Sequence, residues 1–361
     1  MTKMRNILDY TKSELADSIT KIGLEKFRAK QLWNWLYVQG VTDFEAMTNI
    51  KKEYREKLAE NFEIKRPDID KELKASDGVI KWLVKFSDGN LVEVVYIPEE
   101  NRGTLCISSQ VGCTLACKFC HTGTQTLVRN LEAHEIVAQV MLAKDHLNDF
   151  NKKAKNEKAL LTNIVFMGMG EPFFNYENVK KAAEIMTDVD GMDLAHKRIT
   201  VSTSGLVPEI IKSATEMKTG LALSLHATND KLRTEIMAIN KKYPLDEVMK
   251  ACKFYNNENK AQKITFEYVM LNGVNDREEH AFELIDLIKK YNLNVKVNLI
   301  PFNPWESCDF VNSGEEKILE FQEILKNEGV VAPIRKTRGM DAMAACGQLK
   351  SDSIRVKKNR R

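Results

Sequence analysis

The sequence predicts an α/β protein built on a partial (β/α)6 barrel, with a small helical domain in front of it. Six short apolar runs have the length and composition of buried strands, and every gap between them can hold a helix. Strands that alternate with helices are usually parallel and joined by right-handed crossovers. The runs are residues 104–109, 162–167, 198–203, 221–226, 264–270 and 295–300.

Two of the gaps, residues 133–147 and 278–291, have a clear helical period of apolar residues. The count of repeats favours a partial barrel, and a doubly wound flat sheet is the competing topology. In both architectures ligands bind at the carboxyl ends of the strands. We therefore expect the functional residues directly after the predicted strands.

The composition is that of a globular protein. Of 361 residues, 43% are hydrophobic and 29% charged, and Gly plus Pro number only 17 and 8, which excludes collagen-like and wholly disordered chains. No apolar run approaches the roughly 20 residues that a membrane helix needs. The first residues lack the apolar core of a secretory signal, so we expect a cytoplasmic protein with no membrane partner.

Residues 1–70 are predicted to form the helical domain. Leu24, Phe27, Leu32, Trp35 and Leu36 are spaced like one apolar helix face. Basic and aromatic residues are interleaved in this part of the chain, which is typical of a domain that contacts RNA and equally of a small domain with a solvated charged rim.

Residues 71–103 are predicted to be a β connector, because two alternating segments flank Ser87-Asp88-Gly89 and an Asp-Gly pair marks a hairpin. The barrel is expected over 104–349 and a basic tail over 350–361. The net charge is only +3, but this tail has six Lys or Arg residues and one acid. Such a tail suits a phosphate backbone, and it suits a solubilising terminus as well.

The cysteines indicate a metal centre. Seven cysteines, an odd number, in a reducing compartment argue against structural disulfides. Cys113, Cys117 and Cys120 follow the first predicted strand within eight residues, and no fourth Cys or His at matching spacing completes a closed tetrahedral site. His121 is adjacent to the last cysteine and poorly placed to bind the same centre. Three ligands imply an open coordination position.

A glycine-rich segment follows the second predicted strand. In Gly168-Met169-Gly170-Glu171-Pro172 the glycines let a ligand approach the backbone, and the carboxylate can accept hydrogen bonds from an ammonium group. Later strand ends add polar groups, which often have only structural roles but here occur on successive strands: Ser202, Ser224, His226 and Asn303. Together they favour a nucleotide pocket.

The cysteine spacing, with Phe119 before the last cysteine, resembles the radical S-adenosylmethionine superfamily. The segments LCISSQVGC, CKFC, MGMGEP, VSTSG, SLHATND, NLIPFNP, RKTRG and AACGQL occur in the order found in its RlmN family of dual-specificity RNA methyltransferases. The resemblance implies a [4Fe–4S] cluster on the three cysteines and S-adenosylmethionine, two molecules per turnover. It also implies the contacts to S-adenosylmethionine, which we expect from Gly170, Glu171, Ser202, Ser224, Leu225, His226 and Asn303.

The same resemblance assigns roles to three further residues. Cys346 would carry the methyl group, a methylene radical on its sulfur would add to C2 of adenine, and a transient disulfide between Cys106 and Cys346 would release the product. Glu93 matches the family's proton acceptor. The implied partners are 23S rRNA at the peptidyl-transferase centre, certain tRNAs beside the anticodon, and a low-potential electron donor such as flavodoxin or ferredoxin.

Three alternatives remain open at this point. A Cfr-type enzyme would use the same cysteines to methylate C8 of adenine. A radical enzyme that activates another protein would not need Cys346. A non-catalytic RNA-binding protein would use the cysteines for a structural metal. The chain departs from some members of the RlmN family near Met340, Ala342 and Met343 and in the loop after Asn303, so we expect RNA contacts or loop packing to differ there.

Overall fold

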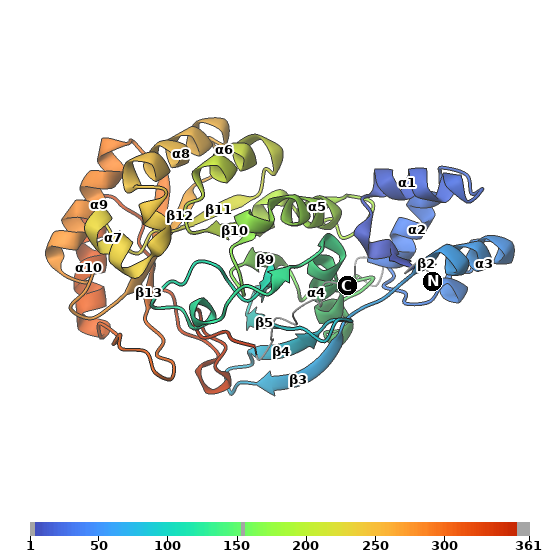
Figure 1. The fold of residues 1–361 in the computed structure, drawn as a ribbon, viewed down its shortest axis with the longest axis horizontal. Coiled ribbons are helices and arrows are strands. Elements are labelled where there is room, and N and C mark those ends of the chain that lie inside the picture. Colours follow the sequence, from blue (N-terminus) through green and yellow to red (C-terminus); the bar gives the residue numbers. More distant parts are fainter. Residues whose placement is uncertain (1–3, 153–155, 352–361) are drawn as a thin grey trace, which may run out of the picture.

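The central feature of the fold is one mixed nine-stranded sheet (Figure 1). The structure is a computed structural model, and it describes residues 4–152 and 156–351. Most of the predicted basic tail, from residue 352 on, lies outside the described residues. The strand order is β13-β12-β11-β10-β9-β6-β5-β4-β3.

Six strands of this sheet are parallel neighbours, as predicted. They are β6 (Arg102–Cys106), β9 (Asn163–Phe166), β10 (Ile199–Thr203), β11 (Gly220–Ser224), β12 (Ile264–Met270) and β13 (Val295–Pro301). Each pairs with the next of these six strands along the chain. A doubly wound sheet reverses its order at a switch point. The order here runs in one direction only, so the partial barrel is confirmed and the doubly wound topology is wrong.

Helices connect the parallel strands and lie along the outer side of the sheet (Figure 1). Both helices predicted from their period are confirmed as α4 and α9. The helices of this part are α4 (Ala133–His146), α5 (Tyr176–Thr187), α6 (Val207–Glu216), α7 (Asp230–Ile236), α8 (Leu245–Glu258), α9 (Glu278–Lys290) and α10 (Glu315–Asn327).

The burial of the strands follows from their place in the sheet. All seven residues of β12 are buried, as expected for a strand covered on both faces. At the other extreme, β3 (Asp68–Lys74) is the outermost strand and mostly exposed. Five of the seven residues in its sequence, DIDKELK, are charged. Charged side chains on an edge strand oppose pairing with a second molecule.

The predicted hairpin is present, and it extends the barrel sheet. Its strands β4 (Ile80–Lys85) and β5 (Leu91–Glu99) are antiparallel. Strand β5 also pairs with β6, with Val95 opposite Cys106. Without β5 the edge of β6 would have unpaired backbone groups. The hairpin therefore lies directly beside the first parallel strand.

The N-terminal domain consists of α1 (Lys12–Lys21), α2 (Arg28–Tyr37) and α3 (Lys52–Asn61), with a parallel bridge between β1 (Arg5–Asn6) and β2 (Phe62–Glu63). A capping box begins α1: Thr11 accepts a hydrogen bond from the Glu14 backbone N–H, and Glu14 accepts one from the Thr11 backbone N–H.

One prediction for this domain was wrong. Phe27 is 60% exposed and does not belong to a buried helix face. The helix begins at Arg28, so the helical period does not extend back to Phe27. The buried residues of α2 are Ala29, Leu32, Trp33, Leu36 and Tyr37.

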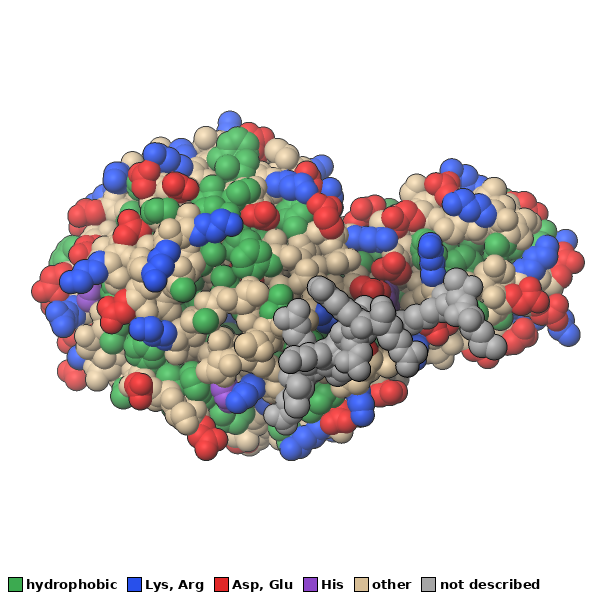
Figure 2. Space-filling model, viewed as in Figure 1, with side chains coloured by type: hydrophobic (Ala, Val, Ile, Leu, Met, Phe, Trp, Pro, Cys, Tyr) green, Lys and Arg blue, Asp and Glu red, His purple; other side chains and the backbone are tan. Residues whose placement is uncertain are grey.

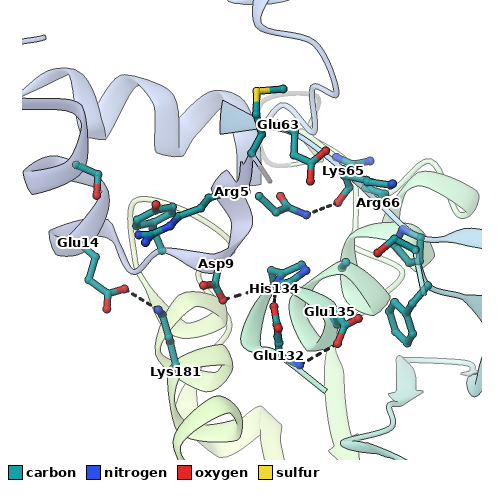
Figure 3. A pocket seen from close by; sticks show the side chains of 18 of the residues that line it. Arg5, Asp9, Glu14, Glu63, Lys65, Arg66, Glu132, His134, Glu135 and Lys181 are labelled. Carbon is teal, nitrogen blue, oxygen red and sulfur yellow. Dashed lines mark hydrogen bonds and ion pairs between the residues drawn. The ribbon is translucent and has the colours of Figure 1, made fainter. Parts of the chain in front are cut away.

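The N-terminal domain is joined to the barrel by ion pairs around a hollow of about 570 Å³ (Figure 3). Lys181 on α5 lies 3.0 Å from the Glu14 carboxylate, and His134 on α4 lies 3.7 Å from that of Asp9. Acidic and basic side chains line the hollow in similar numbers. Because the charges are balanced, the hollow is better explained as an interface between the N-terminal domain and the barrel than as a binding site for a charged ligand.

The surface gives little direct indication of a partner. Figure 2 shows Lys and Arg side chains interspersed with Asp and Glu over the visible face. Within the part of the chain that the structure describes, no helix combines the length and apolar character needed to cross a bilayer.

Candidate functional site

A chamber of about 160 Å³ lies at the carboxyl ends of the parallel strands. This is the edge at which the strand pattern predicts the site. Its wall combines the three clustered cysteines, the glycine-rich segment and one distant cysteine. The lining includes Cys113, Cys117, Cys120, Gly170, Glu171, Ser202, Ser224, His226, Glu267, Arg335 and Cys346.

The three clustered cysteines occupy one end of the chamber. Burial raises the pKa of Cys113 to about 12 and raises the pKa values of Cys117 and Cys120 as well. A metal centre binds the thiolate form and therefore displaces protons from such thiols. No group of three or more His, Cys, Asp or Glu side chains in the described ranges converges on a single ion. A four-iron cluster does not need such convergence, because each cysteine binds a different iron.

His121 does not join the cysteines. Its ring stacks on Trp305 at a centroid distance of 4.6 Å and an interplanar angle of 7°. Its backbone N–H donates to the Gly347 carbonyl at 2.7 Å. The residue after the cysteine loop thus holds the C-terminal segment, as its poor placement for the metal suggested.

The glycine-rich segment passes close to the residues that follow β6 because Gly168 and Gly170 have no side chains. A Cβ at Gly168 would lie 2.7 Å from the Ile107 carbonyl oxygen, and one at Gly170, where φ is +98°, would lie 2.5 Å from Gln110 Cβ. Only glycine fits these positions. They leave Glu171 at the chamber wall.

The Glu171 carboxylate is fixed by two backbone donors. Phe173 N–H donates to Oε1 at 3.1 Å and Ser204 N–H donates to Oε2 at 2.8 Å. Burial raises the pKa of this carboxyl to about 7. An ammonium group that entered the chamber would restore the ionised form. The cradle of glycines and carboxylate therefore fits the amino acid end of S-adenosylmethionine.

The other residues predicted to contact S-adenosylmethionine divide into two groups. Ser202, Ser224 and His226 line the chamber, whereas Leu225 and Asn303 are buried behind its wall. Ring nitrogen Nδ1 of His226 accepts the Val269 backbone N–H at 3.1 Å. Burial, with the nearby Arg233 charge, lowers the pKa of His226 to about 3, so the ring is neutral. Asn303 Nδ2 donates to the Cys346 carbonyl at 3.3 Å.

Cys106 and Cys346 lie near each other and near Arg335, although 240 positions separate them in the sequence. Cys106 ends β6 and is buried, and burial raises the pKa of its thiol to about 12. Both thiols are free. The structure thus brings together the two cysteines that lie outside the clustered motif.

The segment that carries Cys346 is held on two sides. On one side, the N–H of Gly339 and the side chain of Arg338 donate to Asp77 in the β3–β4 turn. On the other, Thr122 Oγ1 donates to the carbonyl of Leu349 at 2.5 Å. These contacts position the distant cysteine beside the cysteine loop.

Glu93 lies behind this segment and does not line the chamber. Its Oε1 pairs with Lys81 Nζ at 2.9 Å, and its Oε2 accepts the Lys350 backbone N–H at 2.9 Å. Lys81 also donates to the Met343 carbonyl at 2.9 Å. Both charged side chains are 8% exposed. The predicted proton acceptor is therefore part of the contact that holds the Cys346 segment.

Sequence reasoning missed four residues that shape the site: Lys81, Arg233, Glu267 and Arg335. Arg233 is fully buried and donates to the Ser204 carbonyl at 2.7 Å and the Leu225 carbonyl at 3.1 Å, which ties the ends of β10 and β11 together. One signal was available for Glu267, a carboxylate inside the apolar run ITFEYVM.

Two family models match the chain. Residues 5–64 match the ribosomal RNA large subunit methyltransferase N-terminal domain, and residues 107–285 match the radical SAM superfamily.

Full-length relatives and one solved structure are similar to this chain. The dual-specificity RNA methyltransferase RlmN of Ruegeria pomeroyi is 50% identical over 98% of this chain and 90% of its own length. That of Sinorhizobium fredii is 49% identical over 99% and 90%. The crystal structure of a radical SAM methyltransferase from Sphaerobacter thermophilus matches with a TM-score of 0.88 and 41% identity, over 96% of this chain and 99% of that one. The chain belongs to the RlmN family of the radical SAM superfamily.

Proposed function

We propose that this protein is an RNA methyltransferase that places a methyl group on C2 of adenine, in 23S rRNA at the peptidyl-transferase centre and in certain tRNAs beside the anticodon. One observation carries the proposal: Cys346 lines the same chamber as the three clustered cysteines, and Cys106 lies nearby. A radical enzyme that does not transfer a methyl group by way of a cysteine thiol would not need Cys346 and Cys106 beside the clustered cysteines.

Cys113, Cys117 and Cys120 would hold a [4Fe–4S] cluster, and Glu171 with the glycine-rich segment would hold the amino acid end of S-adenosylmethionine. When bound, this pair supplies radical chemistry to the chamber, and a further molecule of S-adenosylmethionine supplies the methyl group. Ser202, Ser224 and His226, from the ends of β10 and β11, would hold the rest of the nucleotide. Leu225 and Asn303 would act from behind the wall, through its backbone.

Cys346 would take the methyl group on its sulfur and carry the carbon to adenine C2. Addition of the methylene radical leaves an odd-electron adduct, so release requires loss of the C2 proton and of one electron, which returns to the low-potential electron donor. Attack by the Cys106 thiolate on the Cys346 sulfur then breaks the sulfur–carbon bond. The electron pair of that bond passes to the base, a proton completes the new methyl group, and a Cys106–Cys346 disulfide remains. A thiol reductant must then reduce this disulfide, as in other thiol–disulfide exchanges.

Glu93 would take the C2 proton only after the segment around Cys346 shifts, because its carboxylate is engaged by Lys81 and by the Lys350 N–H. The ion pair with Lys81 favours the ionised carboxylate, which is the form a proton acceptor needs. RNA that enters beside this segment would supply the displacement.

RNA would approach the open side of the chamber, with the N-terminal domain and the basic tail near the surrounding phosphates. A base inside folded RNA must leave its stack to reach such a chamber. An electron donor of low potential, a flavodoxin or a ferredoxin, would supply the electrons that start each turnover.

The test is methylation of rRNA and tRNA fragments by the anaerobically reconstituted protein with labelled S-adenosylmethionine. We expect 2-methyladenosine by mass spectrometry, and loss of all turnover in Cys346→Ala. Product at C8 alone would replace the proposal with a Cfr-type activity. A zinc-containing protein that does not cleave the nucleotide on reduction would contradict enzymatic function, and full activity of Cys346→Ala would contradict the carrier role.

A further inference from the structure

Glu267 on β12 has an oxygen that lacks a hydrogen-bond donor. The side chain is 4% exposed and lies in the chamber wall, with Ser224 and Asn298 as its partners on the adjacent strands. Asn298 Nδ2 donates to Oε1 at 3.0 Å, but Oε2 is buried and receives no hydrogen bond. Buried carboxylate oxygens normally have donors, because leaving one unpaired is costly. This oxygen indicates a donor that arrives with a ligand.

Arg335 is the Lys or Arg side chain among the described residues that line the chamber, and its charge acts on Glu267. Its Nη1 lies 3.9 Å from Met167 Sδ, and among residues 4–152 and 156–351 its guanidinium has no ion-pair partner. The groups that interact with its charge are, in order of strength, Cys346, Glu267, Cys106 and Glu99. The chamber wall therefore presents three chemical groups: a thiol that carries carbon, a hydrogen-bond donor near that thiol, and a carboxylate acceptor.

The Watson–Crick edge of adenine has a complementary sequence of atoms. Next to C2 is N1, which accepts a hydrogen bond, and next to N1 is the carbon that bears the N6 amine, which donates one. With C2 at the Cys346 sulfur, N1 faces a donor and N6 faces an acceptor. Guanine would present an N–H at N1 and a carbonyl oxygen at position 6, so both contacts would be mismatched.

We propose that Glu267 and Arg335 select the target base, with Glu267 Oε2 accepting from the N6 amine and the Arg335 guanidinium donating to N1. This inference rests on the proposed function, because it places C2 at Cys346. Both residues are then substrate-binding residues of the methylation site. Small shifts of the flexible Met167 and Arg335 side chains would admit the amine to Oε2.

Glu267→Gln is a sharp test because Asn298 fixes the orientation of the new amide. With Asn298 oriented as in this structure, where its Nδ2 donates to Oε1, the amide oxygen takes the place of Oε1 and the NH2 group takes the place of Oε2. That NH2 would meet the N6 amine, donor against donor. The matched control is Glu283→Gln on α9, whose carboxylate accepts from Thr228 and Asn229 outside the chamber.

The experiment compares RNA fragments that carry adenosine or purine riboside, which lacks the 6-amine, at the target position. For the wild type we expect methylation of the purine riboside RNA to be about 10- to 100-fold slower, as for sites built to bond a polar group. Glu267→Gln should methylate the adenosine RNA more slowly than the wild type by about the same factor, and its rates on the two RNAs should differ by less than about threefold. Glu283→Gln should keep the wild-type ratio.

Binding gives a second readout that does not need turnover. With S-adenosylmethionine present and no reductant, fluorescence anisotropy should show about 10-fold weaker binding of RNA with 1-deazaadenosine than of RNA with adenosine, and Arg335→Met should abolish this difference. A penalty for 7-deazaadenosine instead would mean that the opposite edge of the base is read, and would overturn the assignment.

The outcomes separate the inference from the proposed function. If the wild type makes 2-methyladenosine but Glu267→Gln retains the full preference for adenosine, the inference alone is wrong. If Glu267→Gln weakens S-adenosylmethionine binding by equilibrium dialysis and leaves base preference unchanged, Glu267 belongs to the cofactor site and the inference is again wrong. Methylation at C8 would refute the proposed function itself.

Discussion

Replacing Lys81 should destabilise the fold and release the segment that carries Cys346. The Lys81 Nζ lies 2.9 Å from the Glu93 carboxylate and 2.9 Å from the Met343 carbonyl oxygen, and both members of the ion pair are 8% exposed. In Lys81→Met the Glu93 charge would stay buried without the Lys81 ammonium group. Removing one partner of a buried pair typically costs about 3–5 kcal/mol.

The assay is urea denaturation followed by circular dichroism. We expect Lys81→Met to lower the free energy of unfolding by about 3 kcal/mol, at the lower end of that range because Glu93 keeps the Lys350 N–H as a donor. The matched control is Lys250→Met, which removes the Lys250–Asp246 pair on α8. Its side chains are 68% and 52% exposed, so the loss should stay below about 0.5 kcal/mol.

A double-mutant cycle would separate the ion pair from other effects of the substitution. Adding Glu93→Gln to Lys81→Met removes the charge that Lys81 balances in the wild type, so the double variant should recover about 2 kcal/mol relative to the sum of the two single losses. Cys346 should also react several-fold faster with an alkylating reagent in Lys81→Met. A loss under 1 kcal/mol with no coupling would refute the reasoning.

Three further predictions concern the chamber. Gly170→Ala should lower the free energy of unfolding in urea by about 3 kcal/mol because its Cβ would overlap Gln110. Gly273→Ala, which has open space around it and φ +70°, should lower it by about 1 kcal/mol. Equal losses of stability in the two variants would contradict the close approach at Gly170. His226 is neutral in the folded protein, with a pKa of about 3, so its contribution to folding stability is complete above its unfolded pKa of 6.5 and is lost as the pH falls toward 3. Between pH 7 and pH 5 the free energy of unfolding of the wild type should therefore fall by about 2 kcal/mol more than that of His226→Asn. Parallel pH profiles of the two proteins would exclude this. Cys117→Ala should abolish the electron paramagnetic resonance signal of a reduced four-iron cluster in anaerobic protein, and an undiminished signal would remove Cys117 from the ligands.

Much of the fold was predictable because the buried faces of strands and helices require apolar residues at regular spacings in the sequence. Strand β12 is an apolar run since both faces of a parallel strand are covered, and α4 and α9 have the helical period of an element packed on one side. Phe27 is the exception. It has the spacing of the buried face but precedes the helix, because the period of apolar residues alone does not locate the first turn of a helix.

The candidate site was predictable only where its residues are close in sequence. The cysteine loop and the glycine-rich segment are local motifs, and both line the chamber. Lys81 and Arg335 were missed because a lysine or arginine is ordinarily an exposed residue, and nothing local indicates that its charge is buried. Glu93 was selected by resemblance, and its engagement by Lys81 and the Lys350 N–H was not predictable.

The sequence by itself determined the order of strands and helices, the three clustered thiols, and the glycines that let a ligand approach the backbone, since each depends on residues a few positions apart. Only the tertiary structure decided that Cys346 lies with Cys106 and Arg335, and that Glu267 has an oxygen without a donor. The physical reason is that parallel strands bring their carboxyl ends to one edge whatever their separation along the chain. Contacts across that edge, such as His121 N–H to the Gly347 carbonyl, form between groups with no local relation in sequence.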